Sequence, residues 1–176
     1  MKIYKTMMEA FDDVGVEPLS ARYGCVFSKG DSIQAMDSRI KCNRSAELWL
    51  RRELIDRAEL QLSIDIFSSL ESNLSKYSGG YCDLSWIEIH TGIEGVLIGT
   101  SQEKNFFSKG QIGNLCAGKS IANCTPSKEG HMHGTDMLLK YSDGLLILPE
   151  ERKILVSRYC APRGYERRIL ERKGIL

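Results

Sequence analysis

The chain has 176 residues, of which 42% are apolar and 27% charged, and its net charge is +1 at pH 7. This composition is that of a soluble globular protein that can bury a sizeable core, and the net charge excludes a global electrostatic attraction to nucleic acid or membranes. Any contact with nucleic acid must therefore come from a local patch. We expect a single domain over residues 1–148 and a short C-terminal appendage over 149–176.

The N-terminus and the cysteines predict a cytoplasmic protein without membrane contacts. The first residues mix Lys2, Lys5, Glu9 and Asp12 with apolar side chains, so they lack the apolar centre of a signal peptide, and no apolar run is long enough to span a bilayer. The six cysteines are scattered without a Cys-x-x-Cys pair, which favours reduced thiols over a disulfide framework.

Helical and extended patterns alternate along the first half of the chain. Residues 1–14 carry apolar side chains at helical spacing and end at Gly15, so we expect a short helix. Residues 21–37 predict a strand and a turn. From Ser45 to about residue 75, apolar residues recur every four positions, and Glu47 and Arg51 form an acid-first pair. This segment predicts a long amphipathic helix, or two helices with a bend near Ser63.

The second half of the chain predicts strands, so the expected class is α+β, with the long helix packed on a small, mostly antiparallel sheet. Residues 84–98 fit a hairpin with a turn at "TGIEG", and they also fit a helix-turn-helix unit with Gly92 in its turn. The hairpin is favoured because Gly95 and Gly99 would weaken a recognition helix. Residues 108–134 indicate a long loop, and 136–148 a hairpin around Asp143-Gly144.

The C-terminal segment "LPEERKILVSRYCAPRGYERRILERKGIL" predicts a pair of basic helices. Pro149 and two glutamates suit the first turn of one helix, and Gly174 suits the end of a second. From Glu150 onward, the segment contains eight basic and four acidic residues. The resulting excess of +4 is typical of a patch that binds phosphate or an acidic protein surface. The bases are Arg152, Lys153, Arg158, Arg163, Arg167, Arg168, Arg172 and Lys173.

Within this tail, "LPEERKILVSRY" followed by "GYERRILERKGI" resembles the helix-turn-helix of sigma-factor region 4 and of phage late-gene antiterminators. The likeness covers about the last thirty residues. It implies transcription regulation, with the arginines facing nucleic acid or an RNA polymerase-type partner. No recognition helix follows Gly174-Ile175, so the resemblance implies contact with a nucleic-acid backbone or a protein and not base readout.

Two cysteines and two histidines in the Gly-rich segment form a possible zinc-ligand set. Cys116, Cys124, His131 and His133 have the thiolate and imidazole donors that tetrahedral zinc prefers. Their spacing differs from that of any standard zinc finger, because the cysteines are separated by seven residues. The alternatives are a zinc site and reduced thiols without a cofactor.

A thiol hydrolase and a purely interacting protein are the alternatives to a regulator. Cys82 follows two glycines, and His131 or His133 precedes an apolar segment that leads to Glu150. The order of nucleophile, base and orienting acid resembles papain-like and cell-wall amidase-like enzymes in outline, although the residues around Cys82 match neither motif. In the third alternative, an immunity-type protein, the helix over 45–75 is a partner-binding face without chemistry.

Overall fold

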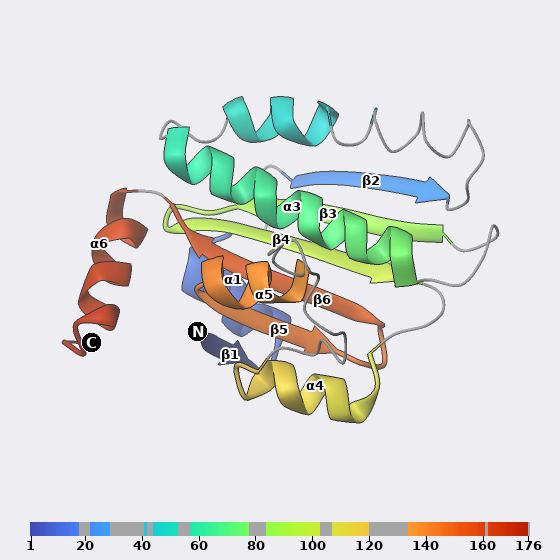
Figure 1. Cartoon of the computed structure of the whole chain (residues 1–176). Helices are drawn as coiled ribbons and strands as arrows, with labels where there is room; N and C mark the ends of the chain where they lie inside the picture. Colours follow the sequence, from blue (N-terminus) through green and yellow to red (C-terminus); the bar gives the residue numbers. More distant parts are fainter. Residues whose placement is uncertain are drawn as a thin grey trace, which may run out of the picture.

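The computed structural model describes residues 1–17, 22–28, 41, 44–52, 57–77, 84–102, 107–119, 134–160 and 162–175. Its centre is a six-stranded sheet with the strand order β1-β5-β6-β4-β3-β2 (Figure 1). β1 and β5 are parallel, and all other neighbouring strands are antiparallel. The strands are β1 (Lys2–Tyr4), β2 (Arg22–Ser28), β3 (Leu84–Thr91), β4 (Gly95–Gln102), β5 (Gly144–Leu148) and β6 (Lys153–Tyr159).

Helices cover both faces of this sheet, which confirms the predicted α+β class. α3 and α5 lie on one face and α1 on the other (Figure 1). Residues 44–52 are also helical and pack beside α3 in the same core. The labelled helices are α1 (Met7–Val14), α3 (Arg57–Tyr77), α4 (Lys109–Cys116), α5 (Gly134–Tyr141) and α6 (Pro162–Arg172).

The central strands are buried on both faces because their side chains alternate between two cores. In β4, Val96 and Ile98 face the α3 side while Leu97 faces the α1 side. In β6, Ile154 and Val156 contact the first core and Leu155 the second. Successive side chains of a strand point to opposite faces, so a strand between two helical layers has a nearly continuous apolar sequence.

The hairpin predicted for residues 84–98 is confirmed, and the helix-turn-helix alternative is wrong. β3 and β4 pair in antiparallel register with Ile89 opposite Ile98, and Gly92 N donates to Gly95 O at 2.8 Å. A Cβ on Gly95 would lie 2.0 Å from the carbonyl oxygen of Arg158. Gly95 therefore permits close approach of β6 to the hairpin turn.

The segment predicted as one helix over residues 45–75 corresponds to the helical residues 44–52 and to α3. Residues 53–56 lie outside the described part of the chain. α3 continues without interruption through Ser63, so the predicted bend is absent there. The helix packs on the sheet through buried apolar side chains at helical spacing, namely Leu60, Ile66, Phe67 and Leu70.

Two predicted segments near the C-terminus were wrong. The hairpin predicted over 136–148 is α5 followed by β5, and the helix predicted to start at Pro149 is a turn followed by β6. In that turn, Arg152 N donates to Pro149 O at 3.1 Å, and Arg152 has a left-handed φ of 47°. β6 lies between β4 and β5, so the boundary predicted at 148/149 falls inside a β-hairpin. The pair of helices that the sigma-factor resemblance implies does not form here.

Two further segments contain elements that the sequence patterns did not separate. Residues 1–14 form β1 and then α1, which starts at the N-cap Thr6 and ends at Gly15, whose φ is 70°. The segment predicted as a loop over 108–134 begins with α4, where Ser108 and Gln111 form a capping box. Residues 120–133 lie outside the described part. β2 confirms the strand predicted after residue 21.

Candidate partner-binding site

The C-terminal helix α6 is attached to the domain through a buried carboxylate at the end of α1. Asp13 accepts hydrogen bonds from Lys2, from Tyr4 OH at 2.6 Å and from Tyr159 OH. Arg167 of α6 contacts the same carboxylate at 2.6 Å and the Asp13 carbonyl oxygen at 3.1 Å. Only 2% of the Asp13 side chain is exposed, so this group lies at the junction of β1, α1, β6 and α6.

The basic and phenolic partners of Asp13 compensate for the burial of its charge. Burial alone would raise the pKa of Asp13, but hydrogen bonds from Lys2, Tyr159 and Tyr4 and the charge of Arg167 outweigh it and lower that pKa. Burial and the hydrogen bond to Asp13 raise the pKa values of Tyr4 and Tyr159. At neutral pH, Asp13 is therefore ionised and both phenols are protonated. The carboxylate can then attract Lys2 and Arg167 and accept hydrogen bonds from both tyrosines.

A second carboxylate holds the next arginine of α6. Asp143 Oδ2 accepts from Arg168 Nε at 3.0 Å and from the backbone N–H of Tyr159 at 2.9 Å. The side chains of Asp143 and Arg168 are both almost fully buried. The N–H of Asp143 donates to Ser157 O at 2.8 Å. The segment between α5 and β5 is thereby joined to β6 and α6, and the two consecutive arginines of α6 are both internal anchors.

The start of α6 packs directly on the turn between β3 and β4. A Cβ on Gly164 would lie 1.8 Å from the carbonyl oxygen of Glu94, so the helix backbone touches that turn. The same oxygen accepts from Cys160 N at 3.2 Å, while Glu94 N donates to Val14 O at 2.9 Å. This turn therefore connects α1, β6 and the first turn of α6, which fixes the direction in which the helix leaves the sheet.

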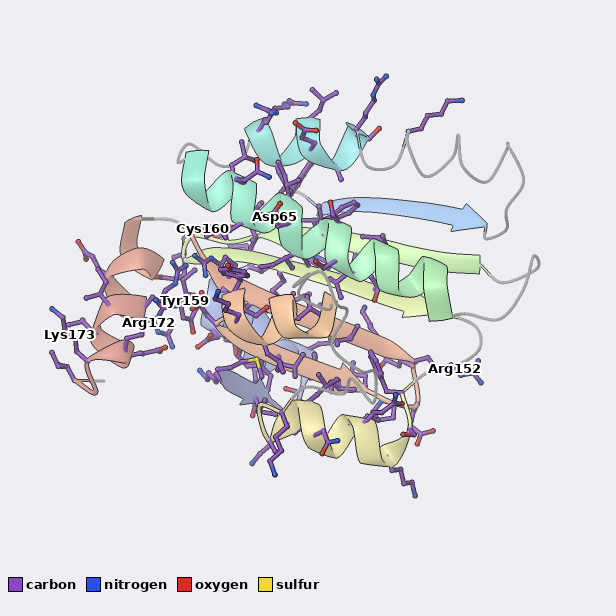
Figure 2. The ribbon with its side chains drawn as sticks, in the orientation of Figure 1. Asp65, Arg152, Tyr159, Cys160, Arg172 and Lys173 are labelled. Carbon is purple, nitrogen blue, oxygen red and sulfur yellow. The ribbon has the colours of Figure 1, made fainter. Side chains whose placement is uncertain are left out.

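The outer part of α6 presents basic and apolar side chains to solvent. Arg172 and Lys173 are exposed and lie at the end of the helix away from the sheet (Figure 2). Gly174 (φ 66°) ends the helix as predicted, because Ile175 N donates to Leu170 O and Gly174 N to Glu171 O, both at 3.0 Å. This Schellman arrangement holds the exposed Ile175 beside the last turn. We call Ile169, Arg172, Lys173 and Ile175 the α6 docking face.

The basic residues of the tail do not gather into one patch, which corrects the sequence-based expectation. Lys153 pairs with Glu88 at 2.5 Å, and the buried Arg158 donates from Nη1 to Tyr141 O at 2.7 Å. Arg167 and Arg168 are the anchors described above. Arg152 is exposed in the β5–β6 turn, far from Arg172 and Lys173 (Figure 2). Arg163 lies in the first turn of α6. Neutralisation inside the fold thus removes much of the excess of +4.

A second ionisable cluster lies on the α1 side of the sheet. Glu88 Oε2 is 3.4 Å from His90 Nε2, while Glu88 Oε1 contacts Lys153 of β6. Burial favours a higher pKa for Glu88, but the hydrogen bonds from His90 and Lys153 lower it to about 2. His90 packs against Phe11 with 5.0 Å between ring centroids. These contacts join β3 to β6 and α1, so we assign the cluster a structural role.

The residues of the predicted thiol hydrolase and zinc site lie mostly outside the described part. This applies to Cys82, Cys124, His131 and His133. Glu150, the expected orienting acid, is exposed in the β5–β6 turn, and Cys116 is exposed at the end of α4. Among the residues that the structure describes, no three metal-ligating side chains come together. Both hypotheses therefore remain predictions from the sequence.

Asp13 and Asp143 are the site residues that the sequence-based prediction missed. Asp12 and Asp13 occupy the last turn of α1, where the helix dipole disfavours acidic side chains. Acidic residues at this unfavourable position indicate a basic partner elsewhere in the fold, although they do not identify Arg167. Asp143 was assigned to a turn with Gly144, yet a Cβ on Gly144 would lie 2.3 Å from Tyr4 OH. Gly144 therefore serves close packing of β1 on β5.

Comparisons with known proteins do not indicate a function for this chain. The chain matches no protein-family model, no curated protein and no solved structure. Among the described helices, none is both long enough and apolar enough to cross a bilayer. The function must therefore be inferred from the surfaces that the fold exposes and the groups that it holds in place.

Proposed function

We propose that the protein is a cytoplasmic regulatory protein without catalytic activity. It binds through its α6 docking face to an acidic protein surface of the transcription machinery, such as an RNA polymerase subunit. The observation that carries this proposal is that some basic residues of α6 bind inside the fold while others are exposed. Arg167 and Arg168 bind internal carboxylates, whereas Arg172 and Lys173 are exposed at the far end. The helix is thus immobilised with its last turn available.

A fixed helix suits a docking role for entropic reasons. Association orders flexible segments and side chains, and that ordering opposes binding. Here, two arginine–carboxylate contacts and the packing of Gly164 on Glu94 already hold the helix against the sheet. A partner that binds the α6 docking face therefore orders only the exposed side chains of the last turns.

The mixed character of the face favours a protein partner. Ile175 is 64% exposed and Ile169 36% exposed, and they flank Arg172 and Lys173 in the sequence. Contact with a nucleic-acid backbone needs cations and gains little from apolar side chains. A protein interface instead combines apolar contacts with complementary charge, which provides specificity and steers association. An acidic, partly apolar protein surface is the complement of this face.

The proposal predicts that charge reversal on α6 abolishes binding to the partner. We expect Arg172→Glu combined with Lys173→Glu to weaken binding to purified RNA polymerase from the source organism by at least about tenfold, because attraction becomes repulsion. Ile175→Ser should weaken it less. Binding would be measured by fluorescence anisotropy of the labelled full-length protein at two salt concentrations.

The matched control is Arg152→Glu combined with Lys109→Glu. These residues are exposed on other elements, so the double variant has the same net charge as the α6 variant. We expect it to bind like the wild type. Equal losses for both double variants, or no binding of the wild-type protein to the polymerase, would refute the proposed function. Thermal melting of each variant checks that the fold is intact.

A further inference from the structure

The helical segment 44–52 exposes a basic face that is separate from α6. Ala46 and Leu50 are fully buried in the core shared with α3. Arg44, Arg51 and Arg52 are exposed. The steps of three or four residues from Arg44 to Leu48 and from there to Arg51 and Arg52 place these four on one side of a helix with 3.6 residues per turn. We call Arg44, Leu48, Arg51 and Arg52 the 44–52 basic face.

Little of the positive charge on this face is neutralised by the described residues. Arg51 forms an ion pair with Glu47 one helical turn earlier, and its Nη2 and Nε donate to Glu47 Oε1 at 2.6 and 3.0 Å. Neither Arg44 nor Arg52 has an ion-pair partner among the residues that the structure describes. This differs from α6, where two adjacent arginines bind buried carboxylates. Among the described residues, the guanidinium groups of Arg44 and Arg52 therefore have no carboxylate that compensates their charge.

We propose that the 44–52 basic face binds the phosphodiester backbone of a nucleic acid. Guanidinium groups bind phosphate oxygens through paired hydrogen bonds, and exposed Arg and Lys supply most of the sequence-independent affinity for nucleic acid. Residues 44–52 span about 13 Å along the helix axis at 1.5 Å per residue. Three guanidinium groups over this length suit contacts with a few consecutive phosphates of one strand.

The composition of the face favours phosphate over an apolar or protein surface. Leu48 is its single large apolar side chain, and an isolated exposed leucine is common on ordinary protein surfaces. The buried side of the segment is already packed, so the helix has no second apolar face to insert into a membrane. The overall charge of +1 gives no general attraction, so the contact depends on this local charge.

The two surfaces are distinct, which makes the inference independent of the proposed function. Residues 44–52, drawn in cyan, lie above α3, whereas α6 lies at one end of the sheet (Figure 1). A regulator with both surfaces contacts nucleic acid at one site and a protein at the other. Loss of one contact by substitution should leave the other intact.

The test is fluorescence anisotropy of the full-length protein with labelled 20-base-pair DNA and with RNA of the same sequence, over a series of salt concentrations. We expect weak binding, with Kd on the order of 10⁻⁴ to 10⁻⁶ M, that falls with salt. The triple variant R44Q/R51Q/R52Q should lose about tenfold or more in affinity. Its slope of log K against log salt should decrease in magnitude by roughly 2 to 3, at about 0.9 per lost phosphate contact.

Two control variants separate this contact from general charge and from folding. K109Q/K119Q/R152Q removes three exposed positive charges elsewhere and should change neither affinity nor slope. R44K/R51K/R52K keeps the positive charges but removes the planar guanidinium groups that form paired hydrogen bonds with phosphate. It should therefore bind more weakly while retaining most of the slope of log K against log salt. Melting temperatures of all variants should match the wild type, because the substituted side chains are exposed.

Three outcomes would overturn the inference. The first is equal loss of affinity in the two triple Gln variants, which would show non-local attraction. The second is absence of binding to both DNA and RNA at low salt. The third is tighter binding of polyglutamate, or of vesicles containing phosphatidylserine, through the same arginines, which would assign the face to a protein or a membrane. The α6 variant R172E/K173E should bind DNA within about twofold of wild type, because its substitutions lie outside the 44–52 basic face.

Discussion

Gly164 shows how a single residue can fix the position of a helix. Gly164 lies in the first turn of α6. Its role comes from the absence of a side chain, because the carbonyl oxygen of Glu94 occupies the place that a Cβ would take. Such a close approach between residues 70 positions apart has no signature in the local sequence.

We expect Gly164→Ala to destabilise the protein by about 1–3 kcal/mol, since the added methyl group forces α6 away from the β3–β4 turn. Gly113→Ala in α4 is the matched control, because nothing lies within 4 Å of its added Cβ. That substitution should stabilise the protein by about 0.5–1 kcal/mol through helix propensity. Urea denaturation of both variants measures the difference. A Gly164→Ala variant as stable as the wild type would contradict the close packing.

At the scale of elements, the attachment of α6 depends on carboxylates from distant segments. Asp13 lies at the end of α1 and Asp143 just before β5, and each accepts from one arginine of α6. A helix held by such contacts should loosen selectively when one carboxylate is neutralised. The rest of the sheet, which is held by its apolar cores, should respond less.

We predict that Asp13→Asn lowers the free energy of unfolding by about 1–3 kcal/mol and accelerates amide hydrogen exchange in residues 162–175, because Lys2 and Arg167 lose their charged partner. Asp12→Asn, at the exposed neighbouring position, should leave both quantities near wild-type values. Exchange followed by mass spectrometry resolves α6 from the sheet. Uniform acceleration over all elements would show that Asp13 supports the whole fold and not α6 in particular.

The elements that the sequence predicted correctly have strong local determinants. The hairpin over β3 and β4 follows from alternating side chains and a Gly-rich turn, and Gly174 ends α6 through a left-handed backbone conformation. The segment from Pro149 to Tyr159 was misread because Pro-Glu-Glu suits a helix start as well as a turn. Its Ile-Leu-Val run also fits either a helical stripe or a strand buried on both faces.

At the scale of the whole molecule, ion pairs across the sheet make stability depend on pH. Glu88 has an ordinary pKa of 4.5, which falls to about 2 in the fold, and the pKa of Asp13 is also lowered, from 3.8. A carboxyl group with a depressed pKa stabilises the fold fully above its unfolded pKa and loses this contribution as pH falls toward the folded pKa. Stability should therefore be flat near pH 6 and decline from about pH 5 to 2.

The substitution Glu88→Gln isolates one part of this acid transition. The variant should be less stable than wild type near pH 6, because Lys153 loses its partner, and the difference should shrink as pH approaches 2. Chemical denaturation at several pH values from 2 to 7 gives the two curves. Parallel curves over the whole range would mean that Glu88 does not titrate with a depressed pKa in the folded protein.

The fold class followed from the sequence, whereas the predicted division into a domain and an appendage did not agree with the sheet. Alternating helical and extended periodicities are local properties, and they established that helices and a mostly antiparallel sheet coexist. The place of β6 between β4 and β5 depends on pairing with strands some sixty residues earlier and ten residues earlier in the chain. A strand at the centre of a sheet looks like any apolar run until its partners are known.

The sequence by itself determined the β3–β4 hairpin, the end of α6, the α+β class and the excess of basic residues in the tail, because each depends on side chains close together in the chain. Only the tertiary structure decided which bases remain exposed. Arg167 meets Asp13 across 154 residues, and Arg168 meets Asp143 across 25. Counting charges along a segment cannot reveal such neutralisation, since pairing depends on which distant carboxylates the fold brings to the same place.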